Sequence, residues 1–169
     1  MLTTKKMAMI IALGILLASC NRGVTPFTPA ELAAIAGEDA DKNGVRDDID
    51  ALILKTYSEK DHREAFLQFA RIEQSKLAAD VTEESASKIM FETFRASDCV
   101  RKKIPAYSHP ERIGREFWHG PLPYDPNRFF GEIIVLTANT DLRKRAMNRF
   151  SAHVTSFPVP DGSEEVCDF

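Results

Sequence analysis

Apolar residues recur at helical spacing through most of the chain beyond residue 27. The first element has the pattern of a capping box, with Thr28 followed three residues later by Glu31, and Gly37 ends it. Residues 127–139 are apolar and rich in β-branched side chains, so a strand stays open there, although the length of the run favours a helix. Further helices are predicted over residues 49–57, 61–79, 82–99 and 140–153.

Prolines and glycines break the helical pattern from Ile104 to Pro126. This segment is predicted to be a long loop, with room for one helical turn over residues 111–118. The fold class that follows is mostly α: a small irregular bundle of about five to six helices, with an acidic loop between the first two and this long Pro/Gly-rich loop.

The first 19 residues differ in kind from the rest. Lys5 and Lys6 precede an uncharged apolar run, which ends in Leu17-Ala18-Ser19-Cys20. This is the layout of an export signal, and it is too short to span a bilayer as a stable anchor. One interpretation of this segment is an ordinary secretory signal with an unrelated cysteine near its cleavage site.

Leu17-Ala18-Ser19-Cys20 resembles the lipobox of bacterial lipoproteins. The resemblance implies cleavage before Cys20 and attachment of diacylglycerol to its sulfur, which would bind the protein to a membrane. Asn21 rather than Asp after the cysteine implies, by the Gram-negative sorting rule, delivery to the outer membrane with the domain facing the periplasm. The chain then divides into a signal peptide (1–19), a lipidated tether (20–27) and a single helical domain (28–169).

Charge and cysteine content agree with export. Removal of residues 1–19 takes away two lysines and no acid, so the net charge falls from −3 to about −5, which counts against a nucleic-acid partner. With Cys20 assigned to lipid, Cys99 and Cys167 remain as an even pair in an oxidising compartment. We predict a disulfide between them that pins residues 156–169; two separate buried thiols or a metal pair are the alternatives.

Residues 39–50 carry the sharpest chemical motif. Short oxygen-bearing side chains alternate with spacers, and Gly44 permits a sharp turn at the sixth position. The pattern resembles the calcium loop of EF-hands and the single Asp-rich loops of dockerin and thrombospondin type 3 modules. The resemblance implies one Ca²⁺ ion with ligands from Asp39, Asp41, Asn43, the carbonyl of Val45, Asp47 and Asp50.

Two departures from the EF-hand pattern matter. Asp50 replaces the usual glutamate at the twelfth position, and its shorter side chain predicts weaker or less Ca²⁺-selective binding. Arg46 stands at the eighth position, where paired EF-hands have an aliphatic residue in a small strand that pairs with a partner loop. A charged residue there, with no second loop in the sequence, indicates an isolated structural site. The alternative is an Asx-rich turn whose side chains bond only their own backbone.

Other candidates carry weaker signals. The four histidines, His62, His109, His119 and His153, lack metal-ligand spacing, and no GxSxG or P-loop sequence is present. Arg143, Lys144, Arg145 and Arg149 form a basic stripe that we expect to be solvated, with anionic lipid or polysaccharide as a conceivable contact. A possible partner contact in the long loop comprises Arg112, Arg115, Phe117, Trp118, His119 and Tyr124; the alternative is a lid over the core.

A wider resemblance links the chain to uncharacterised proteobacterial lipoproteins. It rests on the Asp-rich Asn-Gly-Val-Arg-Asp-Asp sequence of residues 43–48 and on Asn139-Thr140-Asp141-Leu142-Arg143 ahead of a final cysteine, Cys167. It implies a shared fold and no particular activity.

Together these features predict a periplasmic lipoprotein that acts as a non-enzymatic binding module. Its partner would be an unidentified envelope protein or cell-wall component. An immunity or inhibitor protein against a toxin or cell-wall hydrolase is the second hypothesis, and an enzyme that uses His109 or His119 is the third.

Overall fold

The computed structural model describes residues 25–104, 126–160 and 165–169, and in this part of the chain it contains six helices and no strand. The predicted mostly α fold is confirmed. The long loop predicted between residues 104 and 126 lies outside the described residues. The helices are α1 (Pro29–Ala36), α2 (Asp47–Thr56), α3 (Lys60–Ser75), α4 (Glu83–Lys103), α6 (Pro126–Thr137) and α7 (Asp141–His153).

Side-chain caps begin three of these helices. The Oγ1 of Thr28 accepts a hydrogen bond from the Glu31 backbone N–H at 3.2 Å, and the Glu31 carboxylate accepts one from the Thr28 N–H at 2.8 Å, so the predicted capping box is present. Thr82 and Ser85 form a second capping box at the start of α4, and the Thr140 hydroxyl accepts from the Arg143 N–H at the start of α7. These hydrogen bonds satisfy backbone donors that a helix start otherwise leaves unpaired.

Two helices end at residues other than the predicted ones. Helix α3 ends at Ser75, four residues early, because the backbone turns through Leu77 and Ala78 with shorter-range hydrogen bonds. Helix α4 continues to Lys103. Residues 126–137 form a helix, which resolves the ambiguity between helix and strand at that position.

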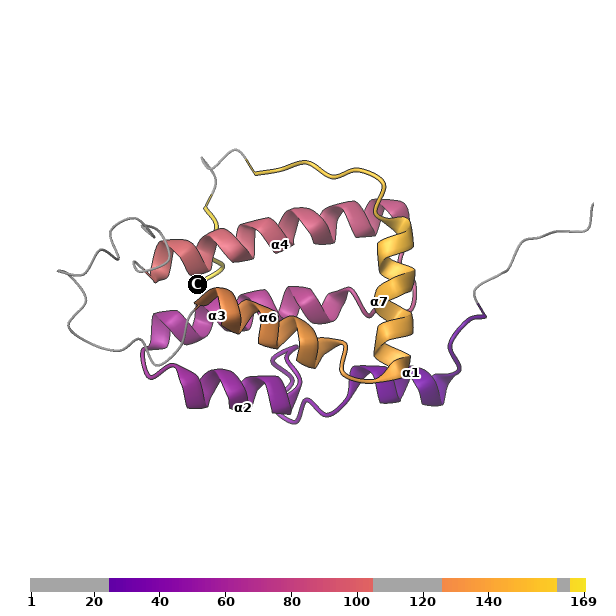
Figure 1. Ribbon diagram of the computed structural model, residues 1–169, viewed down its shortest axis with the longest axis horizontal. Helices are drawn as coiled ribbons and strands as arrows, with labels where there is room; N and C mark the ends of the chain where they lie inside the picture. The colour runs from indigo at the N-terminus through magenta and orange to yellow at the C-terminus, as the bar shows by residue number, and fades with distance from the viewer. Residues whose placement is uncertain (1–24, 105–125, 161–164) are drawn as a thin grey trace, which may run out of the picture.

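The two longest helices, α3 and α4, lie side by side and organise the bundle (Figure 1). Helices α2 and α6 pack on the other side of α3, and α7 crosses one end of the bundle, where it contacts α1 and α4. Residues 37–46 join α1 to α2, and the acidic loop of residues 39–50 comprises most of this connection and the first turn of α2 (Figure 1).

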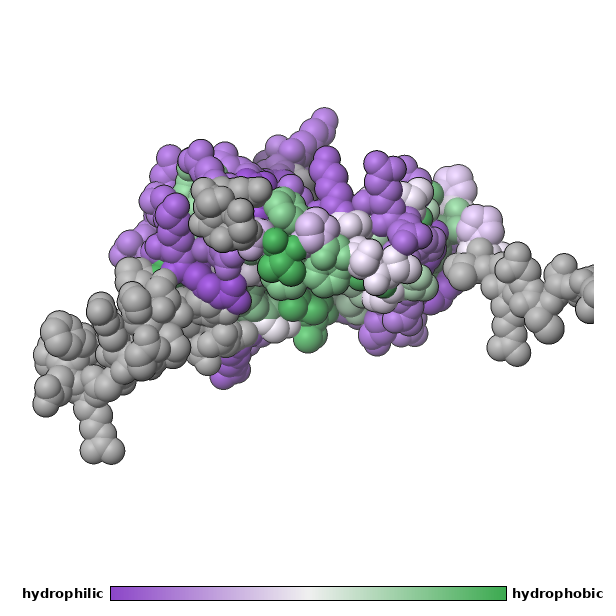
Figure 2. Space-filling model, turned by 90° about the horizontal axis from the view of Figure 1, so that it is seen from above, coloured by the Kyte–Doolittle hydropathy of each residue, from purple (hydrophilic) through white to green (hydrophobic). Residues whose placement is uncertain are grey.

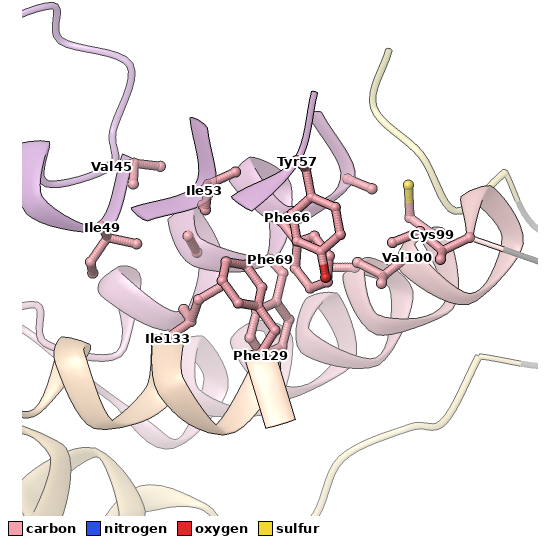
Figure 3. Close-up of a cluster of buried hydrophobic side chains, with 14 of the residues drawn as sticks. Val45, Ile49, Ile53, Tyr57, Phe66, Phe69, Cys99, Val100, Phe129 and Ile133 are labelled. Carbon is pink, nitrogen blue, oxygen red and sulfur yellow. The ribbon is translucent and has the colours of Figure 1, made fainter. Parts of the chain in front are cut away.

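An aromatic cluster fills the main core between α2, α3 and α6 (Figure 3). Phe66 is central: its ring lies 4.7 Å from that of Phe129 and 4.8 Å from that of Tyr57, centroid to centroid. Ile49 and Ile53 extend the cluster toward the acidic loop, and Val45 of that loop is fully buried beside them. The loop is therefore fixed to the core through its own side chain.

A second apolar cluster joins α1 to α7. Phe27, Ile35, Leu77 and Ala146 are its buried members. The Phe27 ring also lies 5.0 Å from the guanidinium carbon of Arg145 and 4.6 Å from that of Arg149, within cation–π range. Phe27, which the predicted tether included, is thus packed on the domain.

A disulfide joins Cys99 of α4 to Cys167, with the two Cα atoms 5.0 Å apart. Residues 165–169 belong to no helix or strand, and polar side chains of α3 and α4 form hydrogen bonds with their backbone. The buried amide of Gln68 donates to the carbonyl of Val166 at 2.9 Å and accepts from the N–H of Asp168 at 3.1 Å. The guanidinium of Arg95 donates to the carbonyl of Glu165 at 2.8 Å. Helices α3 and α4 therefore hold this segment from both sides.

Some apolar residues remain at the surface. Figure 2, which views the molecule from the side of α4, shows hydrophobic residues gathered near the centre of that face with hydrophilic residues around them. On the opposite part of the bundle, Leu52, Val135 and Leu136 contribute to a hollow of about 470 Å³ between α2 and α6. Exposed apolar side chains are ordinary on proteins, so these features alone assign no function.

Replacement of both Cys99 and Cys167 by serine should lower the free energy of unfolding. The disulfide closes a loop with a sequence separation of 68 residues, for which the chain-entropy model gives about 4 kcal/mol. Urea denaturation of the oxidised protein and of the double variant measures the difference. A difference below about 1 kcal/mol would mean that Gln68 and Arg95 hold the segment without the covalent bond.

Candidate metal centre

The acidic loop brings three carboxylates together. Asp39, Asp41 and Asp47 each direct an oxygen atom to a common region, and these oxygens all lie within 4.8 Å of one another. Asp39 and Asp47 are half-buried, whereas Asp41 is exposed. Among the residues that the structure describes, these three form the one group of acidic, histidine or cysteine side chains that are close enough together to hold a metal ion.

Hydrogen bonds from the loop backbone orient these carboxylates. Asp39 accepts from the N–H groups of Asn43 at 3.1 Å and of Gly44 at 3.0 Å, and Asp47 accepts from the N–H of Ala40 at 2.9 Å. The chain turns sharply because Gly44 has a φ of 82°, in the left-handed region that glycine adopts without strain. An Asx-rich turn would make the same local bonds, so these bonds do not separate the two interpretations, and the convergence of the three carboxylates is the feature that a metal ion could use.

Asn43 and Asp50 complete the group. The Asn43 amide nitrogen donates to Asp41 Oδ2 at 3.0 Å and to Asp50 Oδ2 at 3.3 Å. Burial, followed by the negative charges of Asp41, Asp47 and Asp39, raises the pKa of Asp50 above its ordinary value. A cation among these groups would relieve that repulsion. Coordination by Asn43 would require its amide to turn, so that the oxygen faces the carboxylates.

Helix α3 clamps the loop from outside. Gln74 donates to the carbonyl of Gly44 at 3.2 Å and accepts from the N–H of Arg46 at 3.0 Å. The Nε of Arg71 donates to the carbonyl of Asn43 at 3.0 Å. In a paired EF-hand the backbone of the eighth position bonds to a partner loop, and here the Gln74 side chain satisfies that backbone N–H. Sequence reasoning missed both α3 residues, because they lie about 30 positions away and carry no motif.

The side chain of Arg46, at that eighth position, is buried rather than solvated. Only 3% of the residue is exposed, and its guanidinium donates to both oxygens of Asp48, at 2.6 and 2.7 Å. It also donates to the carbonyl of Leu136 near the end of α6, at 2.9 Å. The hydrogen bond from Arg46 holds the pKa of Asp48 below its ordinary value. Arg46 thus ties the loop to α6.

A second buried arginine, Arg143 of α7, ties the same region to α1. Its guanidinium donates to the carbonyls of Ile35 and Ala34 in the last turn of α1, at 2.9 and 3.2 Å, and to the side chain of Asn139 at 2.7 Å. The prediction of a fully solvated basic stripe is therefore wrong for Arg143. Of the other three residues, Lys144 and Arg145 are exposed, and Arg149 donates to the carbonyl of Ala78 at 2.7 Å.

The two arginine side chains meet at Gly37. A Cβ atom at this position would lie 2.3 Å from Cδ of Arg46 and 2.7 Å from Nη2 of Arg143, so only glycine fits. Burial and the charge of Arg46 lower the pKa of Arg143. The two sequence segments behind the wider resemblance, residues 43–48 and 139–143, are thus brought together in one junction.

The remaining predicted site residues lie elsewhere. His62 packs edge-on to Tyr57 with ring centroids 6.1 Å apart, and His153 bonds to the Arg149 carbonyl, so neither joins the carboxylate group. Cys20 and His109 lie outside the described residues. So do the possible partner contacts Arg112, Arg115, Phe117, Trp118, His119 and Tyr124.

Comparisons with protein-family models, with curated proteins and with solved structures find no match to this chain. They therefore give no enzyme family for it. In the described ranges, no helix combines the length and apolar character needed to cross a membrane.

The substitution Asp48→Asn should destabilise the protein in a pH-dependent way. It removes the charged partner of the buried Arg46 guanidinium, at a cost of about 1 to 3 kcal/mol near neutral pH. Because the folded pKa of Asp48 is lowered, its contribution is present above the ordinary titration range near pH 4 and is lost as pH falls through the folded pKa. The gap between wild type and variant should therefore close as pH falls through the folded pKa of Asp48.

Urea denaturation at pH 7, 5 and 3 measures that gap. Asp80→Asn, at an exposed position outside the loop, is the control. A gap of the same size at pH 7 and pH 3 would show that the ionised carboxylate is not the source of the stabilisation.

Proposed function

We propose that the protein is a lipoprotein held at the outer membrane by Cys20, that it faces the periplasm, and that it is a non-enzymatic binding module stabilised by one Ca²⁺ ion. The convergence of Asp39, Asp41 and Asp47 within 4.8 Å, in a segment with EF-hand-like spacing, is the observation that carries the calcium site.

The donor set fits a hard cation. Ca²⁺ takes six to eight oxygen ligands, and the loop offers carboxylates, one carboxamide and a backbone carbonyl. The residues that would hold the ion are Asp39, Asp41, Asn43, Val45 through its carbonyl, Asp47 and Asp50.

The surroundings of the loop favour a structural role over a switch. Val45 is fully buried, and Gln74 and Arg71 bind the loop backbone to α3. A regulatory EF-hand must change the angle between its helices, whereas here the arginines tie the region to α1 and α6. Ca²⁺ would therefore stabilise the junction without opening it.

The proposed anchor places one end of the bundle nearest the membrane. Phe27 is packed on α7, and it follows Cys20 by seven positions. An extended chain covers at most about 3.6 Å per residue, so this tether reaches roughly 25 Å. The end formed by α1 and α7 would stay close to the lipid surface, and a partner in the envelope or cell wall would meet the rest of the bundle.

Millimolar Ca²⁺ should raise the melting temperature by roughly 5 to 10 °C relative to EDTA. A ligand that binds only the native state at a hundredfold excess over its Kd contributes about 2.7 kcal/mol, which corresponds to this shift for a domain of this size. Mg²⁺ should have a smaller effect, because it demands a more rigid octahedral geometry. Differential scanning calorimetry measures the shift.

Asp41→Asn should reduce the Ca²⁺ shift while it leaves the melting temperature in EDTA nearly unchanged, because Asp41 is the exposed member of the group. Asp80→Asn is the matched control. The calcium site would be disproved by the absence of any shift, or by an equal shift in the Asp41→Asn protein.

The substitution Cys20→Ala should release the protein from the membrane fraction, because it removes the proposed attachment point of the lipid. Asn21→Asp is the matched control: the lipid remains, and the sorting rule predicts retention in the inner membrane instead. Fractionation of cells that express each variant gives the result. A wild-type protein found in the soluble fraction would contradict the anchor.

A further inference from the structure

The carbonyl of Val45 is the backbone ligand expected at the calcium loop, and its direction depends on the peptide group that joins Val45 to Arg46. A trans peptide group is planar, and its N–H and C=O point in opposite directions. A partner that fixes the Arg46 N–H therefore also fixes the direction of the Val45 carbonyl.

Gln74 of α3 binds the peptide groups on both sides of Val45. Its amide oxygen accepts from the N–H of Arg46 at 3.0 Å, and its amide nitrogen donates to the carbonyl of Gly44 at 3.2 Å. The N–H and the carbonyl of Val45 consequently point away from α3. The Val45 N–H donates to the side chain of Asn43 at 2.7 Å, so the groups of Val45 that α3 does not hold are turned to the side on which Asn43 lies.

Two further contacts keep this part of the loop in place. The side chain of Val45 is fully buried in the main core, and Arg71 of α3 donates from its Nε to the carbonyl of Asn43 at 3.0 Å. Arg71 is charged, so it would act on a cation by repulsion as well as through the backbone that it holds. Gln74 carries no charge, and its effect on a cation in the loop comes from geometry alone.

We propose that Gln74 is a positioning residue for Ca²⁺: it holds the Val45 carbonyl in the direction of the ion and thereby sets the affinity of the loop. This role rests on the proposed calcium site. Side chains that orient metal ligands without contact to the metal typically contribute about 10- to 100-fold to the affinity. A helix of the same domain thus supplies the backbone bonds that a paired loop supplies in an EF-hand.

The test is a Ca²⁺ titration of the ¹⁵N-labelled protein, followed by NMR at the amides of Gly44 and Val45. Gln74→Met keeps the length of the side chain, its preference for a helix and the charge of the protein, and it removes both hydrogen bonds. It should raise the Kd for Ca²⁺ about tenfold or more. Asn148→Met, which removes an amide at an exposed position of α7, is the matched control and should leave the Kd unchanged.

Gln74→Glu separates geometry from charge. The carboxylate keeps an acceptor for the Arg46 N–H, lacks a donor for the Gly44 carbonyl, and adds a negative charge beside the loop. The added charge alone would strengthen the binding of a cation. Repulsion between the carboxylate and the Gly44 carbonyl should instead turn that peptide group, so we expect the Kd of this variant to exceed that of wild type.

Melting temperatures in EDTA and in Ca²⁺ distinguish positioning from a general effect on stability. If Gln74→Met lowers both temperatures equally and leaves the Kd unchanged, the contribution is purely structural and the positioning role is overturned. Tighter Ca²⁺ binding by Gln74→Glu than by wild type would overturn it as well.

The same titration separates this role from the calcium site itself. A wild-type protein that binds Ca²⁺, together with Gln74 variants that bind it equally well, would remove the role of Gln74 and leave the site. A wild-type protein with no response at about 10 mM Ca²⁺, above the range in which extracellular modules bind the ion, would overturn both.

Discussion

The burial of two arginines around a single glycine is the constraint on which the rest of the structure depends. Arg46 and Arg143 bring like charges together at Gly37, and burial of that kind is costly unless the guanidinium donors are satisfied. The carbonyls at the ends of α1 and α6, together with Asp48 and Asn139, satisfy most of them. The two arginines and these partners belong to α1, the acidic loop, α6 and the start of α7. The guanidinium groups are therefore satisfied only when all four parts of the chain are folded together.

Local chemistry made much of this fold predictable from sequence. The capping box at Thr28 and Glu31 involves residues three positions apart, and the carboxylates of residues 39–50 converge because a turn of fixed length brings them together. The helix over residues 126–137 was harder to predict, since β-branched residues such as Ile133 and Val135 suit either a helix or a strand. Contact with α2 and α3 decides the outcome there.

Long-range polar contacts could not be predicted in this way. Arg143 lies among basic residues that a helical pattern places on a solvated face, and its burial depends on α1, more than 100 residues earlier. Gln74 and Arg71 belong to the polar side of α3, where no periodic signal separates a clamp from a solvated side chain. Such contacts follow from how helices pack, and a single sequence does not encode that packing in any local pattern.

The attachment of residues 165–169 has a consequence for a chain that emerges with its N-terminus first. Val166 is a member of the main core, and Gln68 and Cys99 have their partners in the same short segment. Helices α3 and α4 can pair as soon as residue 103 is available, but one side of their interface stays open until more than 60 further residues have followed. During that interval the thiol of Cys99 lacks its native partner, and the native disulfide can form only after Cys167 has emerged.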